Sequence, residues 1–192
     1  TNDELAFLLA HDSDPFNRWE AGQKLALNEM VRLYQGKGAD SVAPALIAGF
    51  ARVLDDSAAD PAFAALVLTL PAEAELFEAL DHADPTRVCA IHQSVRSVLS
   101  VALNDRWLAA YTAQQREDFV LEESGARALK NLCLAYLALT PSPDFILLAD
   151  THYRQANNMT DRMGALSALA DTDLAIRATL FADFAGTYAR DP

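Results

Sequence analysis

Histidines and cysteines are the side chains of this sequence best suited to metal or nucleophilic chemistry. The four histidines are His11, His82, His92 and His152. None has the His-Glu-x-x-His spacing, which puts two imidazoles one helical turn apart with a carboxylate between them. Cys89 and His92 lie three residues apart and fit one helix face, but a structural zinc ion needs four ligands and no second ligand pair is visible. We therefore predict no metal site.

The two cysteines, Cys89 and Cys133, both lie within apolar helical patterns. Their number allows one disulfide. Burial of both as free thiols in a reducing compartment is the interpretation that we prefer.

Other catalytic signatures are missing from the sequence. No Gly-x-Ser-x-Gly motif and no glycine-rich phosphate loop occurs. The acidic pairs at 55–56 and 122–123 fit solvated helix ends. A self-contained enzyme would need a polar cluster from distant helices, for example His92 with Asp105 or His152 with Asn157, and the sequence leaves this alternative open.

One segment near the N-terminus is richer in distinctive side chains than its neighbours. Phe16 and Trp19 are three residues apart and would share a helix face, whereas Arg18 and Glu20 cannot meet on that helix and must pair elsewhere. We interpret these four residues as a contact to another domain, and a ligand site as the less favoured alternative.

A second distinctive segment runs from Ala156 to Asp161. Adjacent asparagines tolerate left-handed backbone, Thr160 is a candidate helix cap, and Asp161 suits the positive end of a helix. A structural junction explains every residue. The less favoured alternative is that Asn157 or Asn158 touches a substrate.

The elements that must position these residues are helices, because apolar residues recur every three to four positions nearly throughout. Aspartate or serine precedes proline at four expected helix starts, where the side chain accepts orphan N–H groups and proline fits the first turn. Thr1 and Glu4 match a capping box. Gly36 and Gly38 would end the second helix. The expected helices are 2–11, 15–35, 41–55, 61–69, 72–81, 85–113, 124–139, 143–154, 161–170 and 172–188.

Each predicted helix carries an apolar stripe that a neighbour must cover. In 124–139 the stripe includes Leu129, Cys133 and Tyr136, which leaves Arg127 and Lys130 in water. Short linkers favour antiparallel packing. The sequence thus predicts an all-α fold, an irregular α-solenoid-like array of antiparallel helical hairpins with about ten helices, in a single domain over 1–192.

Charge and composition exclude several functions. The 192 residues are 52% apolar and carry a formal net charge of −12. Nucleic acid and anionic membrane surfaces would repel such a chain. No apolar run is long enough to span a membrane, and the first residues do not match a secretory signal. Because no Met begins the chain, we expect an excised piece of a larger protein.

Four stretches, in order along the chain, resemble the C-terminal helical domain of bacterial aminopeptidase N, the monomeric gluzincin-type alanyl aminopeptidase. They are Ala10 to Gln23; Leu68 to Pro71 with Glu75; Arg127 to Asn131 with Cys133 and Leu134; and Ala156 to Asp161 with Ala165 and Leu166. The set covers most of the chain. The resemblance implies the first part of that domain, cut short.

The same resemblance implies a cytoplasmic zinc exopeptidase that removes N-terminal residues from peptides. The family's zinc motif and its Gly-x-Met-Glu-Asn strand are absent here, so no catalytic residue carries over and zinc belongs to the parent protein. The implied partners are the catalytic and β-rich domains, and peptide substrates reach the whole enzyme. The domain would cap the active site and enclose the peptide cavity. The alternative is an independent helical scaffold that binds a peptide or protein.

Overall fold

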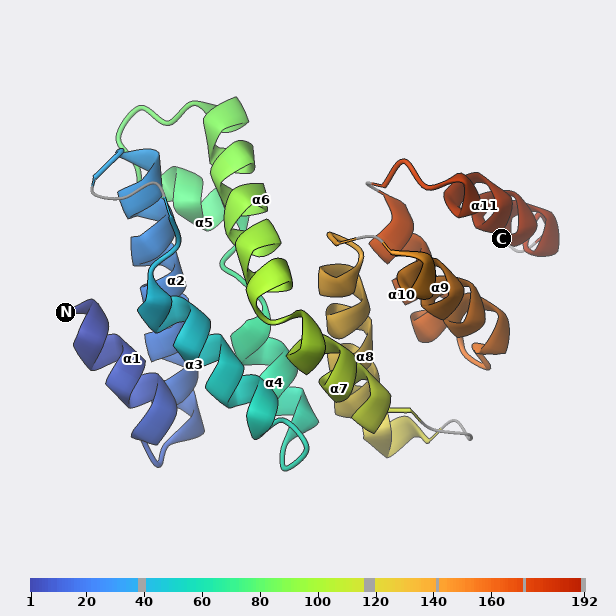
Figure 1. Cartoon of the computed structure of the whole chain (residues 1–192), viewed down its shortest axis with the longest axis horizontal. Helices are drawn as coiled ribbons and strands as arrows, with labels where there is room; N and C mark the ends of the chain where they lie inside the picture. The colour runs from blue at the N-terminus through green and yellow to red at the C-terminus, as the bar shows by residue number, and fades with distance from the viewer. Residues whose placement is uncertain (38–40, 116–119, 141, 171, 191–192) are drawn as a thin grey trace.

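A computed structural model describes residues 1–37, 41–115, 120–140, 142–170 and 172–190. Within these residues the chain forms eleven α-helices and no strand (Figure 1). They are α1 (Asn2–His11), α2 (Pro15–Tyr34), α3 (Pro44–Asp55), α4 (Pro61–Leu68), α5 (Glu73–Glu78), α6 (Pro85–Ala102), α7 (Asn104–Ala113), α8 (Ser124–Leu137), α9 (Pro143–Gln155), α10 (Met159–Ala170) and α11 (Ala175–Thr187). A short 3-10 turn, η1 (Leu121–Glu123), precedes α8.

The helix starts confirm the cap predictions. The side chains of Asp14, Asp60, Asp84 and Ser142 accept hydrogen bonds from backbone N–H groups of the following turn, and each is followed by proline. Thr1 and Glu4 form the predicted capping box. Gly36 has a φ of +65°, as expected for the end of α2. Gly38 lies outside the described residues.

The helices stack as successive pairs along one direction (Figure 1). α1 packs on α2, α7 packs on α8, and α9 packs on α10. Neighbouring pairs join through α1–α3–α7 contacts on one side and α2–α4–α8–α10 contacts on the other. The predicted solenoid-like array is therefore confirmed, and α8 lies at its centre.

The expected helix 85–113 is wrong as a single element, because the helix breaks at Leu103. Leu103 leaves helical geometry at φ −120° and ψ 20°. The indole N–H of Trp107 donates to the carbonyl of Leu99 at 3.1 Å, and the hydroxyl of Ser100 donates to the carbonyl of Tyr136 at 2.6 Å. The first bond spans the break between α6 and α7, and the second joins the end of α6 to α8. Apolar periodicity continues through Leu103, so the pattern alone does not reveal the break.

Two stacked aromatic side chains, one from α7 and one from α8, lie in the core beside this break. The rings of Trp107 and Tyr136 stack with centroids 4.0 Å apart and planes 7° apart. The Tyr136 hydroxyl donates to the carbonyl of Leu68 at 3.2 Å, which ties α8 to the end of α4. Both aromatic side chains are buried. The contacts fix the α7–α8 pair against α4 and so position the residues of α8.

Arg127 and Lys130 of α8 are buried, so the prediction that they lie in water is wrong. Arg127 is 9% exposed and Lys130 is 7% exposed. α8 packs on α4, α7 and α10, so far more of its surface is covered than one apolar stripe requires. Arg127 donates to the backbone carbonyls of Val120 and Leu121. Lys130 points toward α10.

Candidate functional site

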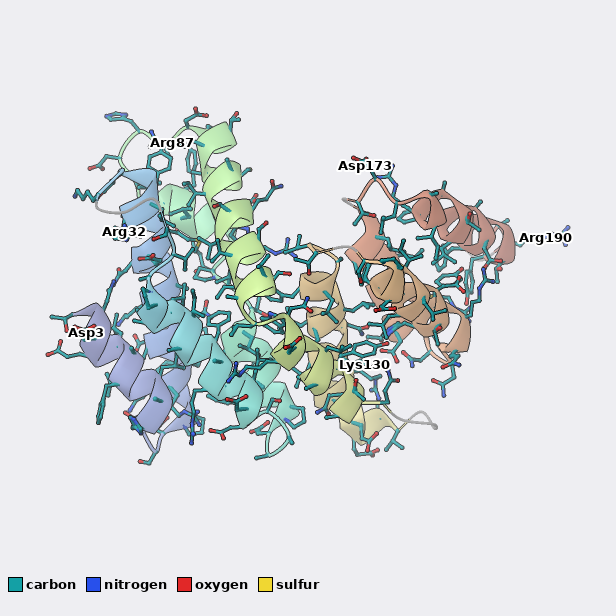
Figure 2. The ribbon with its side chains drawn as sticks, viewed as in Figure 1. Asp3, Arg32, Arg87, Lys130, Asp173 and Arg190 are labelled. Carbon is teal, nitrogen blue, oxygen red and sulfur yellow. The ribbon has the colours of Figure 1, made fainter. Side chains whose placement is uncertain are left out.

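The most unusual polar feature of the structure is a buried ion pair between α8 and α10. The Lys130 ammonium lies 2.7 Å from a carboxylate oxygen of Asp161, and both side chains are less than 10% exposed. Lys130 is labelled in Figure 2. The other Asp161 oxygen accepts a hydrogen bond from the Asn131 amide at 3.1 Å. Buried charges are costly unless they are paired and hydrogen-bonded in this way.

Asp161 remains ionised despite its burial. Burial alone would raise the pKa of this carboxyl, but hydrogen bonds from Lys130 and Asn158, with the charge of Lys130, lower the pKa below its ordinary value. The carboxylate thus accepts hydrogen bonds from Lys130 and Asn131 of α8 and from Asn158, just before α10.

His152 of α9 extends this cluster to α7. Its Nδ1 lies 2.8 Å from the Tyr111 hydroxyl, and its Nε2 lies 3.1 Å from the backbone carbonyl of Asp161. A carbonyl only accepts, so Nε2 carries a proton. When the imidazole is neutral, Nδ1 has no proton and accepts a hydrogen bond from the Tyr111 hydroxyl.

Burial and the nearby charge of Lys130 keep the His152 imidazole neutral. Burial, reinforced by the charge of Lys130, lowers the pKa of His152 to about 4. Burial also raises the pKa of Tyr111 to about 12. Neither group changes its charge near neutral pH. The cluster consequently works as a rigid joint between α7, α8, α9 and α10.

A recess of about 80 Å³ opens beside the cluster. Its walls include Tyr111, Lys130, His152 and Asp161, with Asn157 at the edge. His152 and Asn157, one of the two residue pairs considered for a self-contained enzyme, therefore share one recess. The space accommodates a few water molecules and no peptide.

The two predicted substrate-cavity candidates, Asn157 and Asn158, differ in their surroundings. Asn158 accepts a hydrogen bond from the Asp161 backbone N–H at 2.9 Å, and its amide donates to the Asp161 carboxylate at 3.2 Å. Asn158 therefore caps α10, and the prediction that Thr160 does so is wrong because the helix begins at Met159. Asn157 is exposed. Its contact with a substrate stays a prediction.

The four predicted interdomain residues lie at the start of α2. Phe16 is 63% exposed, Trp19 is 36% exposed, and their rings lie 5.7 Å apart. Arg18 donates to the Leu9 carbonyl at 2.9 Å, and Glu20 pairs with Lys24 at 2.8 Å. The two aromatic rings thus share a face, and each charged residue finds its partner elsewhere, as the sequence predicts.

The other chemically suited residues lie apart from this cluster, and two of them, Cys89 and His92, both approach the Glu73 carboxylate. His92 lies 3.2 Å from the Pro71 carbonyl and 3.8 Å from the Glu73 carboxylate, while Asp105 is exposed at the start of α7. Cys133 is buried and Cys89 is only partly buried; both are free thiols. Over the described ranges, no three or more histidine, cysteine, aspartate or glutamate side chains gather in a way that could hold a metal ion. The assignment of zinc to a parent protein stays a prediction.

Sequence reasoning missed Tyr111 and Lys130. Tyr111 lies in an ordinary apolar pattern, and Lys130 lies beside the apolar stripe of α8, so neither gives a signal in one sequence. Among the described residues, no helix has the length and apolar character needed to cross a membrane.

Comparisons with known proteins give a consistent result. The domain family described as "Domain of unknown function (DUF3458_C) ARM repeats" matches residues 2–192. Aminopeptidase N of Haemophilus influenzae is 33% identical over 98% of this chain, and aminopeptidase N of Escherichia coli is 32% identical over 96%. The chain spans only 22% of the length of each of these relatives.

Structural comparison agrees on the fold. The crystal structure of Legionella pneumophila aminopeptidase A in complex with aspartic acid matches all of this chain with a TM-score of 0.83. The match covers 24% of that protein's chain at 22% sequence identity.

Proposed function

The chain belongs to the DUF3458_C family of ARM-repeat domains, homologous to the C-terminal region of bacterial aminopeptidase N, and from this premise we propose that it is a non-catalytic helical domain of such an aminopeptidase. The observation that carries the proposal is the coverage: nearly the whole chain aligns, yet it accounts for about a fifth of the relative. Residues 1–192 then act as one domain of a longer cytoplasmic polypeptide.

The role of this domain is to cap the active site and to enclose the peptide cavity. A rigid helical wall suits that role, because a closed chamber admits short peptides and excludes folded proteins and bulk water. The joint at Lys130, Asp161 and His152 supports the role by fixing four helices against one another. In this proposal zinc and the catalytic residues belong to the parent's catalytic domain, and Asn157 faces the cavity.

Activity of the isolated chain tests the non-catalytic role. With alanyl-nitroanilide as substrate and added zinc, we expect no turnover by the 192-residue chain. Turnover that persists in purified chain and disappears with a chelator would refute the role.

The start of α2 is the proposed contact with the rest of the enzyme. Phe16 and Trp19 expose two adjacent aromatic rings, and exposed apolar surface of this kind marks interaction sites. Replacing both residues with alanine should weaken binding of the chain to a co-expressed catalytic domain. Leu147→Ala is a matched control, because Leu147 is 67% exposed on a different helix. Equal binding by both variants would remove the contact from this surface.

An independent peptide-binding scaffold is the second candidate. A groove of about 460 Å³ between α7 and α9, lined by Val101, Leu108 and Leu148, favours it. A scaffold would function without the catalytic domain. Stable association of the chain with that domain, abolished by the Phe16 and Trp19 substitutions, would exclude an independent role.

A further inference from the structure

A hollow between α6 and the α10–α11 connection is lined by two opposite charges that form no salt bridge with any described residue. The hollow measures about 430 Å³, and its walls include Arg96 of α6 and Asp173 of the connection. Asp173 is labelled in Figure 2, where it lies across from α6. Residues at the end of α8 and just after it also line the hollow.

Arg96 is partly buried, and among the described residues its guanidinium has no oxygen acceptor. It lies over the ring of Tyr136, 5.9 Å from the centroid. No oxygen of the described residues accepts a hydrogen bond from it, and no carboxylate among them lies within 4.0 Å. A guanidinium has five N–H donors in a plane that matches a carboxylate, so Arg96 favours a carboxylate ligand.

Asp173 of the α10–α11 connection supplies the complementary charge. Asp173 is exposed, and none of the described cations lies within salt-bridge distance of it. Its carboxylate can therefore receive an ammonium group. Leu139 and Leu174 add apolar surface to the hollow, and the hydroxyls of Ser167 and Thr172 add polar surface.

A second hollow carries the same kinds of charge, but there the charges are paired. The hollow of about 460 Å³ beside the loop 55–60 is also lined by an arginine and by aspartates. There Arg18 donates to the Leu9 carbonyl, Asp55 pairs with Arg106, and Asp56 pairs with Arg52. The Arg96 hollow differs from this second hollow, because neither Arg96 nor Asp173 has a salt-bridge partner among the described residues.

We propose that the Arg96 hollow binds a small zwitterion, a free α-amino acid or a dipeptide. The ligand's carboxylate would lie on Arg96, its ammonium near Asp173, and its side chain against Leu139 and Leu174. A volume of about 430 Å³ is within the range of small-molecule sites. The site needs no catalytic centre, so it stands or falls independently of the proposed peptidase role.

Binding by the 192-residue chain tests the site, with NMR chemical-shift titration as the readout. L-leucine and L-alanyl-L-leucine distinguish an amino acid from a dipeptide as the ligand. N-acetyl-leucine lacks the ammonium, and leucinamide lacks the carboxylate. We expect saturable binding of at least one zwitterion and weaker binding of both analogues.

Two variants test which charge binds which end of the ligand, and a third is a control. Arg96→Gln should weaken zwitterion and N-acetyl-leucine binding by about tenfold or more. Asp173→Asn should weaken zwitterion binding and leave N-acetyl-leucine unaffected. Arg52→Gln, an exposed arginine on α3, should change nothing. Circular dichroism verifies that each variant is folded.

Several results would overturn the proposal. Absence of saturable binding of either zwitterion up to about 10 mM would do so. Binding that survives Arg96→Gln, or that is lost equally in Arg52→Gln, would also do so. Either result leaves the proposed peptidase role untouched, because that role is measured by turnover and by association with the catalytic domain.

Discussion

Replacing Asp161 with asparagine removes the negative charge from the buried joint while keeping its shape. Asp161 accepts hydrogen bonds from Lys130, Asn131 and Asn158 at 2.7, 3.1 and 3.2 Å. An amide at this position turns one acceptor into a donor and leaves the Lys130 ammonium buried without a counter-charge. Removing one partner of a buried pair costs about 3–5 kcal/mol, a large share of the about 5–15 kcal/mol that stabilises a typical domain.

Chemical denaturation followed by circular dichroism measures this loss. The control is Asp56→Asn, whose partner Arg52 lies 3.0 Å away on the surface, with side chains 47% and 59% exposed. The control should cost less than about 1 kcal/mol. Adding Lys130→Met to Asp161→Asn should recover part of the loss, because the unpaired charge disappears. Equal stability of Asp161→Asn and the parent chain would refute the reasoning.

Three further predictions concern the same core. In the unfolded chain His152 has its ordinary pKa of 6.5, whereas in the folded chain its pKa is about 4. The free energy of unfolding should therefore fall by roughly 3 kcal/mol as the pH drops from 6.5 to about 4, because only the unfolded chain takes up the proton. His152→Gln should remove this fall from a pH series of denaturation curves. Gly164→Ala should lower the denaturation midpoint strongly, because the new Cβ would lie 2.2 Å from the Asn131 amide oxygen. In Gly186→Ala the new Cβ meets nothing within 4 Å, so this variant should stabilise the chain by up to about 1 kcal/mol. Burial raises the pKa of Cys133 to about 12, so a thiol reagent should modify it only after unfolding, while Cys89 reacts slowly in the folded chain.

Each prediction has a contrary outcome. A pH series that is unchanged by His152→Gln would show that another group governs acid stability. Equal midpoints for the two glycine variants would show that α8 and α10 are not in close contact. Rapid modification of both thiols at neutral pH would show that Cys133 is accessible.

Local sequence signals predicted the helix starts well because the cap chemistry is local. Asp14 and the proline that follows it specify the start of α2 through hydrogen bonds to Phe16 and Asn17, so the signal needs no contact with another helix. The end of α6 depends instead on a hydrogen bond from Trp107 and on contacts with α8, which no local pattern records. The expected continuous helix 85–113 therefore failed at Leu103.

The candidate site was less predictable for the same reason. Its members come from four helices, and Lys130 and Asp161 are 31 residues apart in the sequence. A lysine beside an apolar stripe predicts a solvated position unless its counter-ion is known. Asn158 and Asp161 were singled out as a helix junction, and the structure adds that Asn158 itself is the cap.

The last helix is held by few contacts. Leu180 is the one fully buried residue of α11, while Ile176 and Phe184 pack on the core only in part. Hydrogen bonds from Tyr153 to Asp183, from Arg162 to Tyr188 and from Arg177 to the Ala170 carbonyl add to the attachment. Segments with so little apolar burial detach locally at a fraction of the global unfolding energy. Amide hydrogens of α11 should therefore exchange with deuterium before those of α8, while the remaining helices stay folded, so this end of the array behaves as a separate cooperative unit.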